Sequence, residues 1–529
     1  MIFLVSDFSY EEISGGAEYV DQFFLNSIEG LTFIKSHDLT EEEFSSKNQY
    51  IISNFTQLSE KTKTRLIESG NYIIVEHDYK FVRERNPIKY PNFKVPFDLR
   101  VNALFYNTAK AVFAQSDYHA QILKRNLPFS NIISFNGTFY KQDHLDLLQK
   151  ISKERTVKNG KYAVIGSNHI SKGKHKTEQF CKKNNIEYEI IRHMDYEKFL
   201  LKLSEYTGLV FLPQTPETFC RLIYEAKVLG LKVKTNKNSG IIHEKWIKDT
   251  PESLINYIKV KQQQNLALLL KTLNTKKQEN FVLTEIVSMY KSEKFIGSFL
   301  ENLCKQSLFN HTKILLINCD SPSFDKEREI IEPYLNKHKN IELVNLDSDP
   351  GIYGAWNEGI KRAVTKFVCN SNTDDMRFVN ATEEMIDILN NNPKDCLIYG
   401  DSRVMREYGV LTTEKSEHST YEFSRENMIK CLPGPNPIWR SNLHEKYGLF
   451  DEKCKYAGDW EYWLRIVEGG ETFYKIKKDI GACYFNPTGL TTSKTKQAEK
   501  HEEESKIFYQ YKDVFGEENY KNYKGYFIK

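Results

Sequence analysis

Residues 350–360 read Pro-Gly-Ile-Tyr-Gly-Ala-Trp-Asn-Glu-Gly-Ile, and the apolar run 366–369 and the polar run Asn372-Thr373-Asp374-Asp375 follow them. The glycines predict a turn that leads into a helix, and the apolar run predicts a strand that ends in an acidic tip. Open α/β sheets bind ligands at the carboxyl ends of their strands. Two adjacent carboxylates there suit a divalent cation that holds a diphosphate. Asp is also common at helix caps and turns, so the tip alone leaves a structural role open.

A second acidic block lies further along the chain. Residues 458–465 read Gly-Asp-Trp-Glu-Tyr-Trp-Leu-Arg, a helical pattern with Asp459 near its start. In this order, the two blocks resemble the donor-binding core and the late acidic motif of inverting glycosyltransferases of family two. That family has the GT-A fold, so the resemblance implies a GT-A domain in the C-terminal half.

The resemblance also implies roles for the acidic residues. Asn372 and Asp374 stand at the metal-binding motif, where Asp374 would be the principal ligand of Mg²⁺ or Mn²⁺ and Asp375 would support it. Asp459 would be the general base that takes a proton from the acceptor hydroxyl in a single, inverting displacement. The residues alone leave Asp459 open as a helix cap, and Glu461 is a rival base.

Three more residues are expected to bind the donor by the same resemblance. Tyr290 and Asp320 follow predicted strands at 284–289 and 313–318, where the family recognises the base or ribose. Asn357 lies on the helix that approaches the donor. For Asp320 the alternative is an Asx turn before the next proline, and many family members carry two acids at this point, whereas this chain has one.

The first part of the chain carries a separate set of motifs. Gly15-Gly16 follow a predicted strand at 2–6 and open a helix that Ser14 could cap, a place where an anion can approach the helix N-terminus. Further on, residues 215–230 predict one helix, with Thr215 as its cap and Pro216 at its first position.

This helix would carry Glu217 and Glu225, about 12 Å apart along its axis. With Lys172-Gly173, these features resemble retaining glycosyltransferases of family four, which have the GT-B fold. The resemblance implies that Lys172 binds the donor diphosphate, that Glu217 faces the sugar as the catalytic residue, and that Glu225 holds the ribose, with Gly15 and Gly16 in the donor-binding loop. The usual Arg near the Lys is absent, so a non-catalytic scaffold that binds acceptor stays open.

The alternation of strands and helices predicts an α/β protein with parallel sheets. A chain of 529 residues exceeds what one core usually supports, so several domains are expected. We predict a GT-B-like pair of Rossmann-type subdomains at 1–155 and 156–270, a linker at 271–280, a GT-A domain at 281–493 and a helical tail at 494–529. Predicted strands of the first region are 2–6, 50–54, 72–76, 111–115, 162–165, 188–191, 209–212 and 232–235, and those of the second are 284–289, 313–318, 341–345, 367–370 and 396–400.

Composition narrows the class of protein. A formal net charge of +3 gives no case for nucleic-acid binding. Nine Cys without a CxxC pair predict reduced thiols and a cytoplasmic protein. No apolar run approaches the ~18 residues of a membrane span. The mixed-charge tail is expected to be a solvated helical face, with a peripheral contact to the inner face of a membrane as the alternative.

The two family resemblances together imply a bifunctional glycosyltransferase. It would move sugars from nucleotide-sugar donors to a glycan or glycolipid acceptor in the synthesis of a surface polysaccharide or lipopolysaccharide. Mg²⁺ or Mn²⁺ would serve the C-terminal module, with no organic cofactor. The alternatives are a single active C-terminal transferase with an N-terminal acceptor-binding module, and a nucleotidyltransferase, which would release pyrophosphate. The sequence does not predict an oligomeric state.

Overall fold

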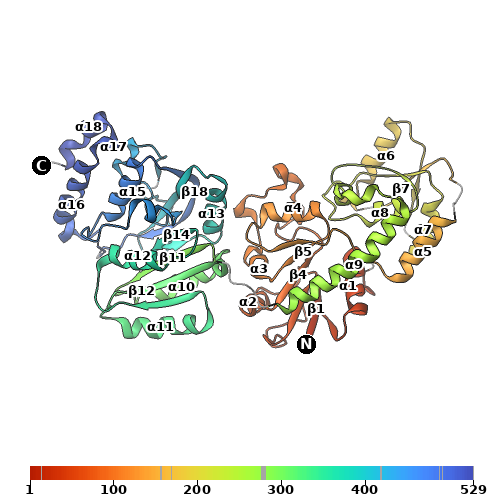
Figure 1. Cartoon of the computed structure of the whole chain (residues 1–529), viewed down its shortest axis with the longest axis horizontal. Coiled ribbons are helices and arrows are strands. Elements are labelled where there is room, and N and C mark those ends of the chain that lie inside the picture. The colour runs from red at the N-terminus through yellow and green to blue at the C-terminus, as the bar shows by residue number, and fades with distance from the viewer. Residues whose placement is uncertain are drawn as a thin grey trace. The chain divides into compact units, whose positions relative to one another are not determined.

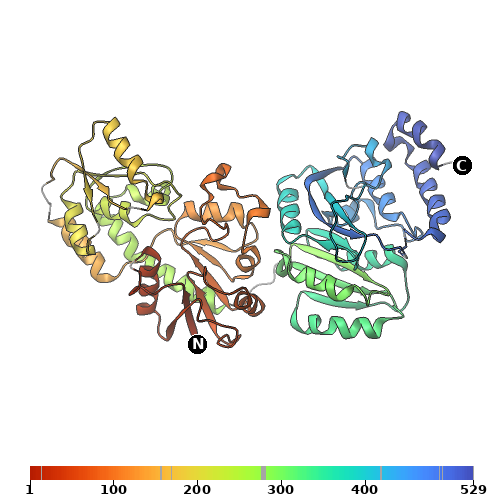
Figure 2. The same cartoon turned by 180° about the vertical axis from the view of Figure 1, so that it is seen from behind.

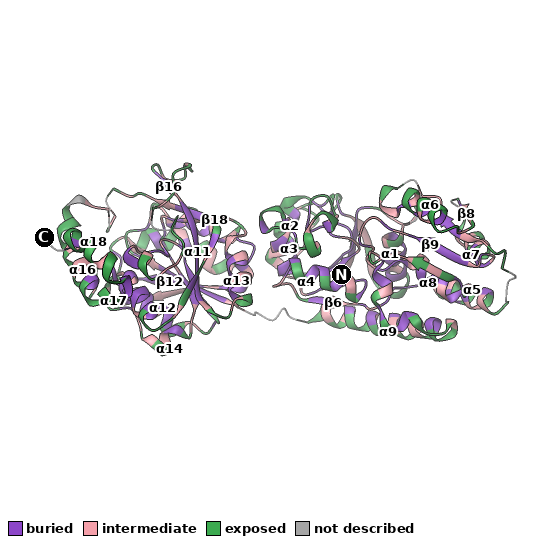
Figure 3. Ribbon diagram, turned by 90° about the horizontal axis from the view of Figure 1, so that it is seen from above, coloured by how far each residue is buried: buried purple, intermediate pink, exposed green. Residues whose placement is uncertain are grey.

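The computed structural model describes residues 1–13, 15–154, 158–167, 169–192, 194–275, 281–417, 420–487, 489–490 and 492–527. The chain forms two compact units, Met1–Gln278 and Glu279–Lys529 (Figure 1). Both are α/β units with helices around parallel or mainly parallel strands. Figure 3 shows that the strands are largely buried, whereas the outer faces of the helices are exposed.

The first unit begins with a parallel six-stranded sheet in the order β2-β1-β3-β4-β5-β6. Its strands are short and apolar, and β4 is buried along its whole length. The strands are β1 (Ile2–Ser6), β2 (Leu31–Lys35), β3 (Gln49–Ile52), β4 (Tyr72–Glu76), β5 (Val112–Ala114) and β6 (Ile132–Ser134), and the helices are α1 (Gly16–Ser27), α2 (Glu60–Ser69), α3 (Ala103–Thr108) and α4 (Asp117–Asn126).

A second parallel sheet, in the order β10-β9-β7-β8, completes the first unit. Its elements are α5 (Gln142–Lys153), β7 (Tyr162–Ile165), α6 (Lys174–Lys183), β8 (Tyr188–Ile191), α7 (Tyr196–Ser204), β9 (Gly208–Phe211), α8 (Arg221–Val228) and β10 (Lys232–Thr235). The long helix α9 (Pro251–Asn274) contacts α5 and α8 here and β3 and β4 of the first sheet. It therefore ties the two halves together, and from behind it is seen beside the first sheet (Figure 2).

The second unit holds one eight-stranded sheet in the order β13-β12-β11-β14-β17-β16-β18-β15. The first four strands are parallel, and β17 joins β14 to β16 in antiparallel pairing. The strands are β11 (Leu283–Met289), β12 (Thr312–Asn318), β13 (Ile341–Asn345), β14 (Phe367–Ser371), β15 (Met376–Arg377), β16 (Asp395–Met405), β17 (Ile438–Arg440) and β18 (Thr472–Tyr484). The helices are α10 (Ile296–Cys304), α11 (Phe324–Lys337), α12 (Gly351–Arg362), α13 (Ala381–Asn391), α14 (Leu443–Tyr447), α15 (Gly458–Glu468), α16 (Gln497–Gln510), α17 (Lys512–Phe515) and α18 (Glu517–Phe527).

The expectation of an α/β protein with parallel sheets is confirmed, but the glycine-rich stretch is not a turn before a helix. Helix α12 begins at Gly351 itself, whose φ of 73° turns the chain into the helix. The later glycines allow close packing. A Cβ on Gly359 would lie 2.4 Å from Cγ2 of Ile286 on β11, so only glycine lets α12 lie this close to the sheet.

The prediction that a helix begins at Thr215 and Pro216 is also wrong. Helix α8 begins only at Arg221. The preceding residues 212–220 are irregular, and Glu217 forms an isolated bridge with Ser239: its backbone N–H donates to Asn238 O (2.6 Å), and its O accepts from Gly240 N (2.9 Å). Glu217 and Glu225 therefore do not share a helix, and the axial spacing predicted for them does not apply.

The predicted linker at 271–280 is partly helical. Helix α9 continues to Asn274, with Thr275 as its C-cap. Residues 276–280 lie outside the described part of the chain. Among the described helices, none combines the length and apolar composition that a bilayer crossing requires.

Replacing Gly359 by Ala is expected to lower the free energy of unfolding of the second unit by about 1–3 kcal/mol, because the new methyl group overpacks against Ile286. Chemical unfolding followed by tryptophan fluorescence measures this. Gly525→Ala in α18 is the control, since a Cβ there meets no atom within 4 Å. A Gly359→Ala protein as stable as the wild type would contradict the packing argument.

Candidate active site

Strand order places a ligand crevice in the second unit. From β11 the chain builds outward through β12 to β13 and then crosses back to β14 on the other side of β11. The direction of winding reverses between β11 and β14, and such switch points open a crevice at the carboxyl ends of the strands. Tyr290 follows β11, Asp320 follows β12, and Asn372 follows β14, so all three lie at this edge.

Two of these residues are open to solvent. The Tyr290 ring is 46% exposed, and the Lys291 ammonium lies 5.2 Å from its centroid. Asp320 is exposed and has a φ of 50°, a conformation that Asp tolerates better than most residues. An aromatic face and a carboxylate are thus available to a ligand at the ends of neighbouring strands.

The acidic tip after β14 is held in a defined arrangement. Asp375 is 5% exposed. Its Oδ2 accepts from Asn372 Nδ2 (3.1 Å), and its Oδ1 accepts from the backbone N–H of Tyr484 (3.3 Å). Burial, together with the charge of Asp374, raises the pKa of the Asp375 carboxyl to about 7. Burial also raises the pKa of Asp374, whose carboxylate lies beside the side chain of Asn486.

A buried ion pair lies next to the turn that carries Asp374 and Asp375. Nε of Arg377 lies 3.7 Å from Oε1 of Glu285, and both side chains are 3% exposed. Ser371 Oγ donates to the same Glu285 oxygen (2.7 Å) and accepts from Arg377 (3.3 Å). The backbone of Arg377 is fixed to Asn302 through two hydrogen bonds of 3.0 Å. The turn that carries Asp374 is therefore held at both of its ends.

The donor set fits a cation that takes its other ligands from substrate. No group of three or more His, Cys, Asp or Glu suited to a metal occurs among the residues that the structure describes. Burial, and after it the charge of Asp374, raises the pKa of Asp375, so ionisation of both adjacent carboxylates is unfavourable. Mg²⁺ is commonly bound by one or two carboxylates plus phosphate oxygens and water. The pair suits that mode of binding and does not suit an all-protein cage.

The late acidic motif meets the glycine-rich helix. Asp459, half-buried in the first turn of α15, accepts from the hydroxyl of Tyr353 on α12 (3.1 Å), and Cys431 Sγ lies 3.6 Å from its other oxygen. A Cβ on Gly458 would lie 2.9 Å from the Tyr353 ring, so this contact depends on glycine. Burial raises the pKa of Asp459. Because α12 begins after the carboxyl end of β13, Asp459 lies at the same edge of the sheet as Asp374.

One interpretation of the sequence made Asp459 the N-cap of α15, and the structure contradicts it. The cap is Ala457, and the helix begins at Gly458. Glu461, the rival base, is 7% exposed and forms an ion pair with Arg465, while its Oε1 accepts from Tyr511 (2.6 Å). Glu461 is thus engaged in structural contacts, whereas Asp459 has no ion pair among the described residues.

Asn357 does not face the crevice. It is 1% exposed, its Nδ2 donates to Phe450 O (3.0 Å) and Glu452 Oε1 (2.9 Å), and its Oδ1 accepts from Phe450 N (3.0 Å). These bonds fix the segment 450–452 against α12. The structure therefore contradicts the expectation that Asn357 contacts the donor, and it gives the residue a structural role. Sequence could not show this, because its partners Phe450 and Glu452 lie 93 and 95 residues away.

In the first unit, Lys172 and Glu217 meet. Lys172 Nζ lies 2.9 Å and 3.1 Å from the two Glu217 oxygens. The sheet order β10-β9-β7-β8 reverses between β7 and β9, and Lys172 follows β7 while Glu217 follows β9, so the pair lies near that switch point. The neighbouring Thr218 donates to His77 O beside the first sheet (3.1 Å), which brings the two sheets of this unit together here.

Glu225 is placed differently from its predicted ribose-binding role. It is 4% exposed, and its Oε1 accepts from Tyr140 OH (3.1 Å) and Tyr196 OH (2.8 Å). Burial raises its pKa. This carboxylate is buried and bonded to two tyrosine hydroxyls, so it is not available to a ligand.

The glycine loop before α1 is also occupied by a side chain. Gly15 is the N-cap and Gly16 begins the helix, while Ser14, the predicted cap, lies outside the described residues. A Cβ on Gly15 would lie 2.2 Å from Glu18 Oε2. The Glu18 carboxylate thus stands at the helix N-terminus, where the sequence predicted a bound anion.

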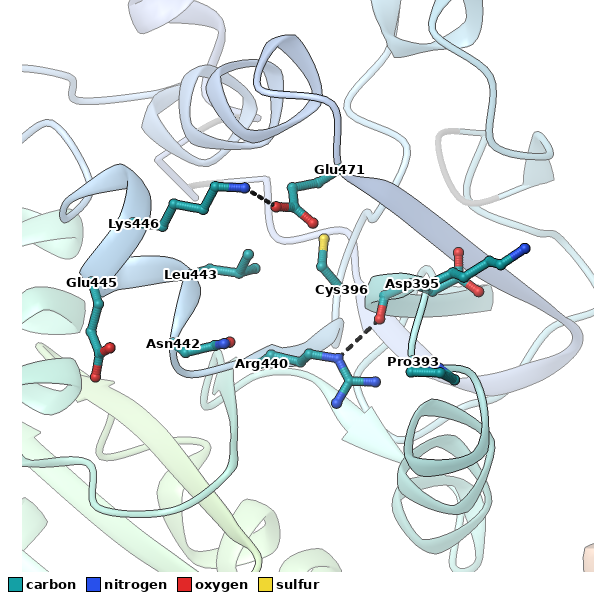
Figure 4. Close-up of a pocket in the computed structure, with 10 residues that line it drawn as sticks. Pro393, Asp395, Cys396, Arg440, Asn442, Leu443, Glu445, Lys446 and Glu471 are labelled. Atoms are coloured by element: carbon teal, nitrogen blue, oxygen red, sulfur yellow. Dashed lines mark hydrogen bonds and ion pairs between the residues drawn. The ribbon is translucent and has the colours of Figure 1, made fainter.

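A cavity of about 430 Å³ lies elsewhere in the second unit (Figure 4). Arg440, which lines it, pairs with Phe367 at the amino end of β14, so the cavity is at the edge opposite Asp374. Two of its basic side chains are engaged: Lys446 pairs with Glu471 (2.7 Å), and Arg440 Nε donates to Asp395 O (3.0 Å). We therefore do not assign the reaction to this cavity.

A family comparison covers the first acidic motif, whereas Asp459 lies outside the matched residues. Residues 285–446 match the family model Glycosyl transferase family 2. The second unit contains a family 2 glycosyltransferase domain.

Relatives of this domain are distant. An uncharacterized glycosyltransferase of Methanocaldococcus jannaschii is 22% identical over 189 residues, which make up 35% of this chain and 64% of that protein. The poly(ribitol-phosphate) beta-N-acetylglucosaminyltransferase TarS of Staphylococcus aureus is 24% identical over 216 residues, or 38% of this chain and 37% of TarS. The chain thus spans less than two thirds of either relative. A solved structure of S. aureus TarS 1–349 with UDP-GlcNAc has 17% identity and a TM-score of 0.38 over 46% of this chain and 72% of that one, too low to support a function.

Replacing Asp375 by Asn is expected to stabilise the ligand-free protein more at pH 8 than at pH 5, by roughly 2 kcal/mol. The folded pKa of about 7 exceeds the ordinary 3.8, so the carboxyl stabilises the fold at low pH and this stabilisation is lost as pH rises through 7. Unfolding in urea at both pH values measures the difference. The exposed Asp325→Asn is the control, and equal shifts in both variants would contradict the burial argument.

Proposed function

We propose that the second unit is a metal-dependent, inverting glycosyltransferase that uses a nucleotide-sugar donor. The observation that carries this proposal is the placement of Asp459 and the pair Asp374–Asp375 at one edge of the sheet, beside the β11–β14 switch point. A diphosphate site and a base at one crevice are what transfer from a nucleotide sugar requires. The family 2 match over residues 285–446 supports the same reaction class.

Each residue then has a distinct task. Tyr290 offers its exposed ring to the base, and Asp320 offers a carboxylate to the ribose. Asp374, supported by Asp375 and Asn372, would hold Mg²⁺ or Mn²⁺. When bound, such an ion supplies positive charge that offsets the charge on the departing diphosphate.

Asp459 acts on the acceptor. Its carboxylate takes the proton from an acceptor hydroxyl as that oxygen bonds to the anomeric carbon and the bond to the diphosphate breaks, so the configuration inverts. Burial raises its pKa, which makes it a stronger base than an exposed Asp. The Tyr353 hydroxyl and Cys431 hold the carboxylate in one orientation.

The acceptor is proposed from chemistry and from the names of relatives. We infer a glycan or glycolipid of a surface polysaccharide. Two relatives have names that refer to poly(ribitol phosphate) or teichoic acid. They are TarS and the minor teichoic acid biosynthesis protein GgaB of Bacillus subtilis, and GgaB is 22% identical over 262 residues. We also infer a cytoplasmic location, because the nine cysteines, all within the described residues, form no disulfide with one another.

We further propose a second transferase site in the first unit, which would make the protein bifunctional. The Lys172–Glu217 ion pair beside the β7–β9 switch point favours it. Two parallel sheets joined by α9 are compatible with the GT-B-like pair of subdomains expected from sequence. Against it, Glu225 is buried and Glu18 occupies the α1 N-terminus, so a non-catalytic module that binds acceptor is the alternative.

Asp459→Asn is expected to lower kcat by at least about 100-fold with the donor KM little changed, because the amide cannot take the proton. The measurement is nucleoside diphosphate release from a panel of nucleotide sugars with Mn²⁺. Release of pyrophosphate in place of the diphosphate would favour a nucleotidyltransferase. Turnover of Asp459→Asn at the wild-type rate would remove Asp459 as base.

Asp374→Ala is expected to abolish the response of turnover to added Mn²⁺, since it removes the more accessible of the two carboxylates. Titration of activity and of nucleotide binding against Mn²⁺ tests this. Glu217→Ala is the control in the other unit, and it should leave C-terminal turnover intact if the sites are separate. Equal loss of both activities in Glu217→Ala would instead indicate one composite site.

A further inference from the structure

The C-terminal helices form part of the core around the base-bearing helix. Trp460 on α15 stacks against Phe515 (6.2 Å between ring centroids) and Phe527 (5.9 Å) of the tail. Tyr511 donates to Glu461 (2.6 Å). The residues next to Asp459 in sequence are thus covered by the tail, which the sequence predicted to be a solvated face.

One tail carboxylate holds the backbone that leads into α15. Glu503 Oε2 accepts from Lys455 N (2.7 Å), and its Oε1 accepts from Tyr456 N (2.9 Å) and Ala457 N (2.7 Å). A second tail residue, Glu499, accepts from the Tyr456 hydroxyl (2.8 Å). Three consecutive N–H groups therefore point at a single carboxylate from α16.

These three residues set the start of the helix that carries the base. Ala457 is the N-cap, and its carbonyl accepts the first intrahelical bond from Glu461 N (3.0 Å). Only Gly458 separates Ala457 from Asp459. Glycine leaves the backbone more freedom than any other residue, so this junction needs an external constraint. Hydrogen bonds to a charged acceptor are roughly twice as strong as neutral ones, which suits Glu503 to that task.

We propose that Glu503 is a positioning residue for catalysis, which fixes the start of α15 so that Asp459 points toward the acceptor hydroxyl. This inference rests on the proposed role of Asp459 as base. It makes the tail a component of the transferase unit. The contact acts only on the base and not on the edge residues Tyr290, Asp320 and Asp374, so its loss should lower kcat and spare donor binding.

The test compares Glu503→Gln and Glu503→Ala with Glu502→Gln in the full-length protein. Glu502 is on the same helix but forms an exposed ion pair with Lys506 (2.7 Å), so its variant is the matched control. The probe is the nucleotide sugar of the panel above that the wild-type protein turns over fastest, with Mn²⁺, followed by release of its nucleoside diphosphate. We expect kcat to fall roughly 10- to 100-fold in Glu503→Gln and further in Glu503→Ala, with the KM for that donor within twofold of wild type.

A second measurement reports on the geometry of Asp459 without turnover. Cys431 donates to Asp459, and burial together with the Asp459 charge holds the pKa of this thiol well above its usual range. Displacement of Asp459 should make Cys431 react with iodoacetamide at least tenfold faster, as measured by mass spectrometry. We expect this in Glu503→Gln and Asp459→Asn and not in Glu502→Gln.

The outcomes separate this inference from the proposed function. If Asp459→Asn is inactive while Glu503→Gln keeps wild-type kcat and Cys431 reactivity, the positioning role is wrong and the base stands. If Asp459→Asn turns over normally, the proposed base itself fails. A fall in kcat with an equal rise in KM and loss of folded protein would show that Glu503 serves stability only.

Discussion

The hydrogen bond from Tyr353 to Asp459 joins two segments that lie 106 residues apart, and the active-site interpretation depends on it. It brings the first turn of α12 against the first turn of α15. The contact is possible because Gly458 has no Cβ to collide with the Tyr353 ring. The glycine-rich motif that carries Tyr353 and the acidic motif that carries Asp459 therefore pack against each other. The buried hydroxyl of Tyr353 orients the Asp459 carboxylate.

Charge at the sheet edge imposes the second constraint. Asp374 and Asp375 lie close together after β14 with little solvent, which disfavours their ionisation. The fold places the buried pair Glu285–Arg377 beneath them, and it secures the turn through Asn302. A rigid pair of carboxylates that is unfavourable without a counter-ion is well suited to a cation that arrives with a diphosphate. Two buried carboxylates side by side destabilise the folded protein when both are ionised. Such locally unfavourable arrangements are common at binding sites.

The sequence predicted the parallel sheets well, because runs such as 72–76, 162–165, 188–191 and 341–345 are short, apolar and flanked by helical patterns. It missed β2, β6, β15, β17 and β18, whose residues are mixed in polarity or very few, so that periodicity gives little signal. It placed four residues at the carboxyl edge of the second sheet, because each follows a predicted parallel strand: Tyr290, Asp320, Asp374 and Asp375. The sequence did not predict that Asn357 and Glu225 are buried and hydrogen-bonded, because their hydrogen-bond partners come from distant segments.

The tail shows the same limit. A mixed-charge helix reads as solvated, and nothing in the sequence marks Glu503 as different from Glu502. Only the fold brings Glu503 to the three backbone N–H groups before Asp459. Helix α8 is a comparable case: Pro216 is a good first helical residue, yet backbone pairing of Glu217 with the 238–240 segment prevails over that local preference.

We propose that a single carboxylate, opposed to a metal-bound diphosphate, deprotonates the acceptor for direct displacement at the anomeric carbon. The most direct measurement is the anomeric configuration of the freshly formed product, determined by proton NMR with the second unit as the only active site in a Glu217→Ala protein. We expect a glycoside of configuration opposite to that of the donor, because one direct displacement inverts the anomeric carbon. A product with the donor's own configuration would contradict it.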